Sequence, residues 1–573
     1  MDKNSKQSIW LPVIIAVSIA LGIFVGNHYR TLSGYRSGNA GYGGGNKIDA
    51  ILNIINKQYV DTVNMEELIE GTIPKIFSEL DPHSVYISAE DVERANEDLE
   101  GSFSGIGVSF NMQTDTILVI SVIPGGPSEK AGLLPFDRII TINDSVYAGR
   151  KVSQEEIMKN LRGAKNSVVK LGVKRGNEPE LLTFEVTRGD VPVNSVDVAY
   201  KVADGIGYIK ISKFGRTTYN EFITAIAKLK LENCKSFVID LRSNTGGYME
   251  AAVNMINEFM PEGSLIVYTE GKAFPRSDVY ANGTGTCKDA PIVVLTDEIS
   301  ASASEIFAGA IQDNDRGLII GRRTYGKGLV QSPISLSDGS EIRLTIARYY
   351  TPSGRCIQKQ YTLGEGEEYD QDIYNRFMHG EFDSADSIKL DDHLKYQTAG
   401  GRTVYGGGGI MPDIFIPRDT SGISSYFTSV VNSGVLYLYA LEYSDHHRKE
   451  FAAYKDYEEL HAYLKQQPLL EDFTNFAAKK GIRKRPHLIA ISGKLIEKQL
   501  QAYIVRNFFD DAGFYPIFLS DDVTLLRAVK VLQEGKSNPI FNTDGNLQSQ
   551  ASTPQGYGLF KEIIHEDAVA GLV

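Results

Sequence analysis

The sequence predicts an α/β protein: a βα core with an inserted β domain, a helical N-terminal segment and a mostly helical C-terminal region. Continuous apolar runs separated by helical stretches in residues 190–423 indicate a largely parallel sheet that is buried on both faces. Short alternating runs bounded by Gly, Pro or Asn indicate a β domain in residues 101–189. With 573 residues, the chain has room for about three or four domains.

The N-terminus predicts an exported protein. Residues 9–26 form an uncharged apolar run of about 18 residues, long enough to cross a bilayer, and they follow Lys3 and Lys6. Residues 1–30 are therefore expected to be a membrane anchor or, alternatively, a signal sequence. We favour an inner-membrane anchor that leaves the rest of the chain in the periplasm of a bacterium. The Gly-rich residues 31–46 would then be a flexible linker.

The elements follow in order along the chain. Residues 47–100 have helical spacing, with Ile51, Ile54 and Ile55 on one stripe. In the β domain we expect strands at 117–122, 138–142 and 168–174, and a helix at 153–162. In the core we expect strands at 237–241, 292–295 and 318–320, and helices at 248–259 and 301–312.

Two regions fall outside this simple alternation. Residues 360–405 interrupt the core, and because residues 365–392 hold ten Asp or Glu against two basic residues, we expect a solvated insertion. Residues 424–540 are predicted to be helical. Residues 541–573 are predicted to be a disordered tail, since their first part is polar and rich in Gln and Ser.

Composition limits the classes of function. The net charge is −13, which argues against nucleic-acid binding, because that requires a basic face. The three cysteines form no CxxC pair and the nine histidines no HExxH pattern, so we expect neither a zinc site nor another cofactor. A hydrolase built on this chain therefore needs a base other than histidine. A buried lysine can serve, since desolvation lowers its pKa.

A serine-rich turn follows one of the predicted core strands. Residues 300–305 open the helix after strand 292–295, and their small side chains would let a substrate backbone approach closely. Unpaired N–H groups in the first turn of a helix can stabilise an oxyanion. Taken alone, the segment is more typical of a plain helix cap. A second loop, residues 240–247, reaches the same sheet edge, so the two loops can supply two backbone donors to one oxygen.

Lys327 is the candidate base. It stands between Gly326 and Gly328 at the start of a predicted strand, and Gln331 is placed to orient its amine. A different S-x-x-K match, Ser167 with Lys170, lies in a predicted strand. Positions three apart in a strand point to opposite faces, so this pair is set aside.

Together these segments resemble the carboxyl-terminal processing peptidases, or tail-specific proteases, of serine peptidase family S41. The resemblance covers about residues 47–415. It is carried by the motifs LDPHSVY (80–86), GSFSGIGV (101–108), PGGPSEKAGL (124–133), DLRSNTGG (240–247), SASASE (300–305), GKGLVQ (326–331), YYTPSGR (349–355) and IMPD (410–413). It implies a crotonase/ClpP-like peptidase core with a PDZ domain inserted at residues 101–189.

The resemblance implies a serine endopeptidase of the Ser/Lys type. The implied roles are nucleophile for Ser302, general base for Lys327, support of that base for Gln331, and oxyanion-hole donors for the backbone of Gly247 and Ala303. Ser300 and Ser304 remain competitors for the nucleophile, because they stand in the same turn. Asp313, one helix length further on, is expected to be structural.

The PDZ-like segment indicates how substrates are chosen. PDZ grooves bind an extended C-terminus by strand addition, while loop N–H groups hold its carboxylate. The substrate-binding residues expected here are Gly105, Ile106, Gly107, Val108 and, as a link to the catalytic site, Arg162. The expected partners are protein substrates bound through apolar C-terminal tails and the membrane through the N-terminal segment. A homo-oligomer of the chain is a further expectation.

Two other functions stay open. The chain could be a PDZ scaffold with a peptidase core that binds tails without cutting them, although Ser302, Lys327 and Gln331 together argue against this. It could also be an acyl-transfer hydrolase of a small substrate, but such an enzyme has no use for a domain that binds protein tails.

Overall fold

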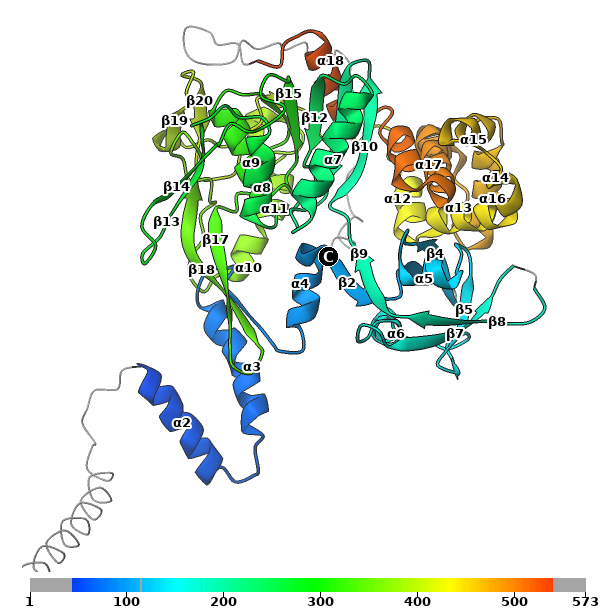
Figure 1. Cartoon of the computed structure of the whole chain (residues 1–573), viewed down its shortest axis with the longest axis horizontal. Coiled ribbons are helices and arrows are strands. Elements are labelled where there is room, and N and C mark those ends of the chain that lie inside the picture. Colours follow the sequence, from blue (N-terminus) through cyan, green and yellow to red (C-terminus); the bar gives the residue numbers. More distant parts are fainter. Residues whose placement is uncertain (1–43, 114–115, 177, 539–573) are drawn as a thin grey trace, which may run out of the picture. The chain divides into compact units, whose positions relative to one another are not determined.

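The computed structural model describes residues 44–113, 116–176 and 178–538 (Figure 1). The predicted anchor at 9–26 and the predicted tail at 541–573 lie outside these ranges, as does nearly all of the Gly-rich linker. Within them, every helix is too short or too polar to traverse a bilayer. The chain divides into two compact units, up to Ile76 and from Phe77 onward, and each is described by itself.

The first unit is helical, as predicted. It contains α2 (Gly44–Gln58) and most of α3 (Met65–Ser78). The Asn64 side chain begins α3 by accepting a hydrogen bond from the N–H of Glu66 at 3.2 Å. Isoleucines of both helices, among them Ile51, Ile54 and Ile69, are exposed in this unit.

The second unit begins with the β domain. After β1 (Val85–Ile87) and α4 (Val92–Glu100), its sheet has the strand order β3-β4-β5-β7-β8, with β6 paired to β5. These strands are β3 (Val108–Gln113), β4 (Thr116–Val122), β5 (Arg138–Ile142), β6 (Ser145–Val146), β7 (Val168–Lys174) and β8 (Leu182–Thr187). Helices α5 (Pro127–Ala131) and α6 (Gln154–Leu161) complete the domain. Strand β3 pairs only with β4 among the described strands, so it forms an edge.

The β domain joins the rest of the second unit through a two-stranded ribbon. In it β2 (Ser102–Gly105) pairs antiparallel with β9 (Gly189–Pro192). The domain has its own core, to which strand and helix side chains such as Ile117, Ile157 and Leu171 contribute. The alternating pattern of the sequence therefore predicted this domain correctly.

The central sheet of the second unit has the order β10-β11-β12-β15-β16-β21. Its members are β10 (Val196–Ala203), β11 (Ile206–Ile211), β12 (Ser236–Asp240), β15 (Ile292–Thr296), β16 (Leu318–Gly321) and β21 (Ile414–Phe415). From β11 to β21 every neighbouring pair is parallel, which confirms the predicted βα layout. The inner strands β12, β15 and β16 are mostly apolar because both faces of the sheet are covered.

Different helices cover the two faces. One face packs on α7 (Thr218–Leu231), α8 (Met249–Asn257) and α9 (Ala303–Asp313), with Phe237 and Phe307 in the shared core. The other face packs on α18 (Val523–Gln533), a helix far downstream in the sequence. There Leu525 joins Val238 and Val293 in a second core.

A further sheet flanks the central one and carries the segment after Lys327. It has the order β1-β18-β13-β14, with β17 paired to β18. These strands are β13 (Leu265–Glu270), β14 (Ser277–Tyr280), β17 (Leu329–Ser335) and β18 (Glu341–Tyr350).

The acidic insertion was predicted to be solvated; most of its acidic side chains are exposed, and the segment is also folded. Helices α10 (Gly366–Asp370) and α11 (Asp372–Met378) precede two 3₁₀ turns, at Ala385–Ser387 and Asp392–Leu394. A hairpin of β19 (Lys395–Gln397) and β20 (Thr403–Tyr405) follows. The acidic side chains of α10 face solvent, whereas Tyr369, Arg376 and Phe382 are buried. The acidic composition of the insertion reflects its exposed side chains and does not predict the few that are buried.

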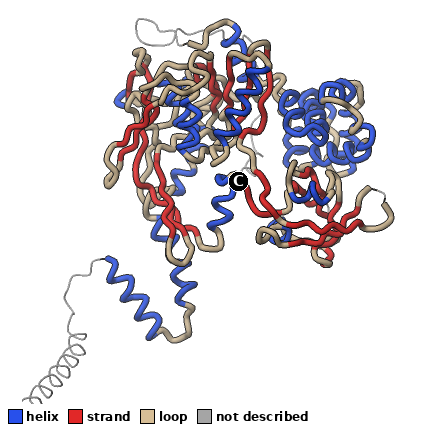
Figure 2. Tube along the Cα trace, viewed as in Figure 1, coloured by secondary structure: helices blue, strands red, loops and turns tan. Residues whose placement is uncertain are grey.

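Between β21 and α18 the chain is helical, as predicted (Figure 2). The helices are α12 (Ser425–Asn432), α13 (Val435–His446), α14 (Arg448–Phe451), α15 (Tyr457–Leu464), α16 (Leu469–Lys479) and α17 (Pro486–Phe518). They have their own core, which includes Phe451, Phe473 and Leu500.

Candidate active site

Three loops meet at the carboxyl edge of the central sheet. They follow β12, β15 and β16, and they carry Gly247, Ser302 and Lys327 respectively. All three residues line one cavity of about 1080 Å³, together with Gln331 of β17. This volume is at the upper end for ligand-binding cavities. In the described ranges, no group of three or more His, Cys, Asp or Glu side chains is placed to hold a metal ion.

Ser302 occupies a strained position at the start of α9. Its φ of +54° and ψ of −115° are costly for a residue other than glycine, so the surroundings must hold it there. Its N–H donates to Glu305 Oε2 at 2.9 Å, and its carbonyl accepts from Tyr349 OH at 3.1 Å. Strain of this kind is typical of functional turns that present a side chain.

The structure separates Ser302 from its two neighbours in sequence. Ser300 is buried and its hydroxyl donates to the carbonyl of Leu241 at 2.8 Å. Ser304 is also buried, and its hydroxyl donates to the carbonyl of Asn244 at 2.9 Å. Both hydroxyls join this turn to the loop after β12, which leaves Ser302 as the serine of the turn that lines the cavity.

Lys327 lies in the cavity without a carboxylate partner: within the described ranges it forms no ion pair. Its Nζ donates to Gln331 Oε1 at 3.1 Å, and Gln331 Nε2 in turn donates to the carbonyl of His83. Burial lowers the pKa of Lys327, and the charges of Asp81 and Glu305 oppose that shift only in part. A lysine of this kind reaches its neutral, proton-accepting form more easily than an exposed one.

The loop after β12 approaches the turn that carries Ser302 through two glycines. Gly246 has φ +104° and Gly247 φ +138°, conformations that favour glycine. A Cβ on Gly246 would lie 2.7 Å from Ser302 Cβ and 3.0 Å from the Ala303 nitrogen, and one on Gly247 would lie 2.1 Å from the Phe214 carbonyl. The N–H groups of Gly247 and Ala303 donate to no group in the described part of the chain. Both are therefore available to a bound oxygen.

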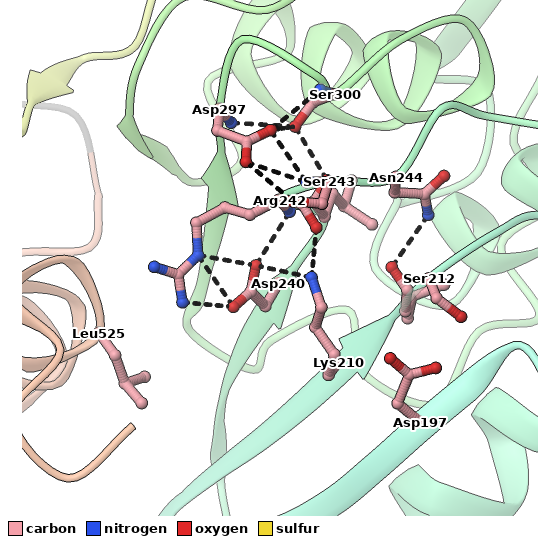
Figure 3. A network of polar contacts seen from close by, with 12 residues as sticks. Asp197, Lys210, Ser212, Asp240, Arg242, Ser243, Asn244, Asp297, Ser300 and Leu525 are labelled. Carbon is pink, nitrogen blue, oxygen red and sulfur yellow. Dashed lines mark hydrogen bonds and ion pairs between the residues drawn. The ribbon is translucent and has the colours of Figure 1, made fainter. Parts of the chain in front are cut away.

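A buried network fixes the start of this loop (Figure 3). Asp240 pairs with Arg242 at 2.6 Å and with Lys210 at 3.6 Å. Burial by itself would raise the pKa of Asp240, but these two cations hold it below its usual value. The N–H of Ser243 donates to both oxygens of Asp297, at 2.9 and 3.0 Å, which ties the loop after β12 to the loop after β15.

Glu305 is a site residue to which the sequence analysis assigned no role. Its side chain is fully buried, and one oxygen accepts from the N–H groups of both Ser302 and Lys327, each at 2.9 Å. The other oxygen accepts from Gly326 N–H at 2.8 Å and Thr324 OH at 2.5 Å. Burial raises the pKa of Glu305 to about 7, against these donors. A signal existed, because Ser302 and Glu305 have the spacing of a capping box.

The expected tail-binding loop lies away from these three loops, in the β domain. Gly105 ends β2, Ile106 is buried, Gly107 has φ +74°, and Val108 begins β3. The carbonyls of Ile106 and Gly107 accept from the N–H groups of Ser128, at 2.8 Å, and Ile123, at 3.0 Å. Their own N–H groups have no partner among the described residues and stand beside the edge strand β3.

Arg162 does not line the cavity. It ends α6, and its Nη1 donates to Glu97 Oε2 of α4 at 2.6 Å. Helix α4 ends at Glu100, whose carboxylate accepts from Arg216 at 2.7 Å and from Tyr248 OH at 3.0 Å. Since Tyr248 follows Gly247 directly, α4 connects the β domain with the glycine loop.

Four segments of the chain match known families. Residues 205–371 match peptidase family S41, and residues 104–187 match the PDZ domain. Residues 32–91 match the N-terminal domain of the activating protease CtpB, and residues 426–510 match a family of unknown function.

Similar curated proteins include two annotated proteases of bacteria. The carboxy-terminal processing protease CtpB of Bacillus subtilis (strain 168) is 33% identical over 317 residues, which cover 55% of this chain and 65% of that protein. A probable CtpA-like serine protease of Staphylococcus aureus (strain MRSA252) is 35% identical over 314 residues, which cover 54% of this chain and 62% of that protein. The chain thus spans slightly less than two thirds of each relative.

Among solved structures, the photosystem II D1 C-terminal processing protease is 28% identical in sequence with a TM-score of 0.31. The match covers 53% of this chain and 88% of that chain.

Proposed function

We propose that this chain, which carries a peptidase family S41 domain and a PDZ domain, is a Ser/Lys endopeptidase that cuts proteins at or near unstructured apolar C-terminal tails. One observation carries the proposal most directly. Ser302 shares a cavity with Lys327, a buried amine that has no counter-ion in the described chain and that Gln331 orients.

The chemistry follows from these groups. Neutral Lys327 takes the proton of the Ser302 hydroxyl as its oxygen attacks the carbonyl carbon of the scissile peptide bond. The resulting ammonium gives a proton to the leaving amine when the carbon–nitrogen bond breaks, which leaves an ester on Ser302. Water, deprotonated by the same amine, then releases the acid and restores the serine.

Charge on the reacting oxygen needs donors that are already in place. The N–H groups of Gly247 and Ala303 have no partner in residues 44–113, 116–176 and 178–538, and Gly246 allows the two loops to approach within contact distance. Donors aimed in advance at a developing oxyanion typically contribute about 2.7–4 kcal/mol each to the lowering of the barrier.

Tail recognition is supported by the PDZ edge. Strand β3 has no partner on its outer side among the described strands, so an extended substrate can add to the sheet there. The N–H groups of Ile106 and Gly107, which donate to no described residue, stand at the start of this strand and suit a terminal carboxylate. We assign Arg162 the link between this site and the peptidase, since its contact with Glu97 leads through α4 to Tyr248.

Location and assembly belong to the same proposal. We propose that the chain is exported and held at the inner membrane by residues 9–26, with the peptidase on the periplasmic side of a bacterium, since that run is apolar and uncharged. Association of several copies remains part of the proposal, and cleavage assays over a range of protein concentrations test it.

The test is cleavage of an unfolded protein that ends in apolar residues. Ser302→Ala and Lys327→Ala are expected to abolish cleavage, while the matched pair Ser167→Ala and Lys170→Ala is expected to leave it unchanged. Full cleavage by Lys327→Ala would exclude the Ser/Lys mechanism. Tail binding without cleavage by the unmodified protein would instead support a scaffold, and cleavage of small esters alone would support the small-substrate hydrolase.

A further inference from the structure

We propose that residues 365–383, within the acidic insertion, brace the loop that carries Lys327, and that Tyr369 is a positioning residue for this lysine. The inference deepens the proposed function and rests on it for its catalytic part. The structural part, a brace on the loop at residues 322–328, stands on contacts alone.

The first set of contacts comes from α11. Arg376 is buried, and its guanidinium donates to the carbonyls of Arg323, at 2.9 Å, and Thr324, at 3.1 Å. Glu381 accepts from Arg376 at 3.2 Å and also from Arg323 Nη2 at 2.6 Å. The loop is therefore held from outside through two carbonyls and one side chain, three residues before Lys327.

The second set converges on the hydroxyl of Tyr369. Tyr369 is buried, and its oxygen lies 2.9 Å from His83 Nε2 and 3.2 Å from Gln358 Nε2, which donates to it. Gln358 Oε1 accepts from the N–H of Gly328 at 2.7 Å. Through Gln358, the hydroxyl thus supports the residue directly after Lys327.

A second chain of contacts links the Tyr369 hydroxyl to the amine of Lys327 through His83 and Gln331. The carbonyl of His83 accepts from Gln331 Nε2, and Gln331 Oε1 accepts from Lys327 Nζ at 3.1 Å. Burial and the charge of Lys327 lower the pKa of His83 to about 4, so its ring is neutral near pH 7. Because Gln358 already donates to the tyrosine oxygen, the tyrosine hydrogen is free to be donated to His83 Nε2. Removing the Tyr369 hydroxyl therefore removes both its contact with Gln358 and its contact with His83.

A buried cation holds the brace against the loop. Lys359 Nζ lies 4.1 Å from the ring centre of Tyr325 and 3.9 Å from that of Tyr369. It also pairs with Asp372 at 3.1 Å, and the Lys359 N–H donates to the carbonyl of Gly326 at 2.9 Å. Ammonium groups held between aromatic faces in this way contribute to packing that is independent of the Tyr369 hydroxyl. A substitution that keeps the ring should accordingly keep the fold of the insertion.

The decisive variant is Tyr369→Phe in the otherwise unmodified chain. We expect kcat to fall about tenfold, as for the loss of a hydrogen bond between buried groups, while KM stays within about twofold. Tyr361→Phe is the matched control, because the Tyr361 ring packs on Tyr369 at 6.3 Å and its hydroxyl bonds to nothing in the described ranges. The control should change neither constant.

Amide hydrogen exchange gives a readout that does not require activity. Peptides spanning residues 322–331 should exchange faster in Tyr369→Phe, and also in Arg376→Lys, which cannot reach both carbonyls, but not in Tyr361→Phe. Faster exchange in Tyr369→Phe with an unchanged kcat would remove its positioning role, and unchanged exchange with unchanged kcat would overturn the brace altogether. If the unmodified protein cleaves nothing, the proposed function fails, while the exchange measurement still decides the brace.

Discussion

Replacing Glu305 by glutamine tests whether one buried carboxylate holds both the loop of Ser302 and the loop of Lys327. All four of its neighbours are donors: the N–H groups of Ser302, Lys327 and Gly326, and the hydroxyl of Thr324. A glutamine keeps the shape but turns one acceptor oxygen into an NH₂ group. At least one buried N–H group then loses its partner, which costs about 1–3 kcal/mol.

This cost falls on the geometry of the site. If the lost hydrogen bond mainly displaces Ser302 and Lys327, the activation barrier of cleavage rises by a similar amount. The value of kcat should then fall about 10- to 100-fold, since each 1.36 kcal/mol of barrier is tenfold in rate. The assay is steady-state cleavage of the tail-bearing protein. Glu298→Gln is the control, because Glu298 pairs with Arg322 at 2.6 Å and contacts neither Ser302 nor Lys327. A Glu305→Gln protein that is folded and keeps kcat within about twofold would refute the reasoning.

The same variant has a signature in stability. Folding raises the pKa of Glu305 from 4.5 to about 7, so the folded chain binds this proton more tightly than the unfolded chain does. The free energy of unfolding should therefore fall as pH rises through this window, by about 3 kcal/mol at 1.36 kcal/mol per pKa unit. Glu305→Gln cannot ionise and should lack this part of the fall. Identical pH dependence in urea unfolding of both proteins would show that Glu305 does not titrate as the structure indicates.

Three other outcomes are expected. Because burial lowers the pKa of Lys327, kcat/KM should rise with pH and level off below the usual lysine value of 10.5, and a pH profile with a midpoint at that value would contradict this. Arg162→Ala removes the 2.6 Å contact with Glu97, so cleavage of tail-bearing proteins should slow more than cleavage of short internal peptides, and equal slowing would argue against the link. Leu525→Ala should cost about 2–5 kcal/mol in thermal or urea unfolding, whereas the half-exposed Leu526 on the same helix should tolerate alanine within about 0.5 kcal/mol.

The core strands could be predicted because their signal is local. A strand buried on both faces reads as a continuous apolar run, and β12, β15 and β16 lie where such runs were found. Loops at the carboxyl ends of parallel strands converge by topology, so the meeting of Ser302 with the glycine loop could be expected. The choice of Ser302 among three serines came from the family resemblance and not from the local pattern, since in the structure it depends on carbonyls of the loop after β12 that are about sixty residues away.

The contacts that support the site could not be predicted from the sequence, because they too join residues that are far apart in the chain. Tyr369 contacts His83 across 286 positions, and Gln331 contacts His83 across 248. No spacing pattern reports such pairs, because chain topology alone brings them together. Arg376 was moreover hidden by its surroundings, since one cation among many acidic residues looks like part of a solvated surface when only composition is counted.

The position of α18 changes how the helical region must be understood. Residues 425–518 follow β21, which pairs with β16, and precede α18, which packs on β12, β15 and β16. The helical region is thus inserted between the central sheet and the helix that covers one of its faces, and is not appended after them. The sheet face lined by Val238, Val293 and Leu295 has α18 as its cover, so a chain ended after β21 would expose that face to water. Tyr515 and Phe518 at the end of α17 pack on the same face, so deleting residues 425–509 while keeping the end of α17 and α18 through a linker is the truncation that removes most of the helical region without uncovering the central sheet.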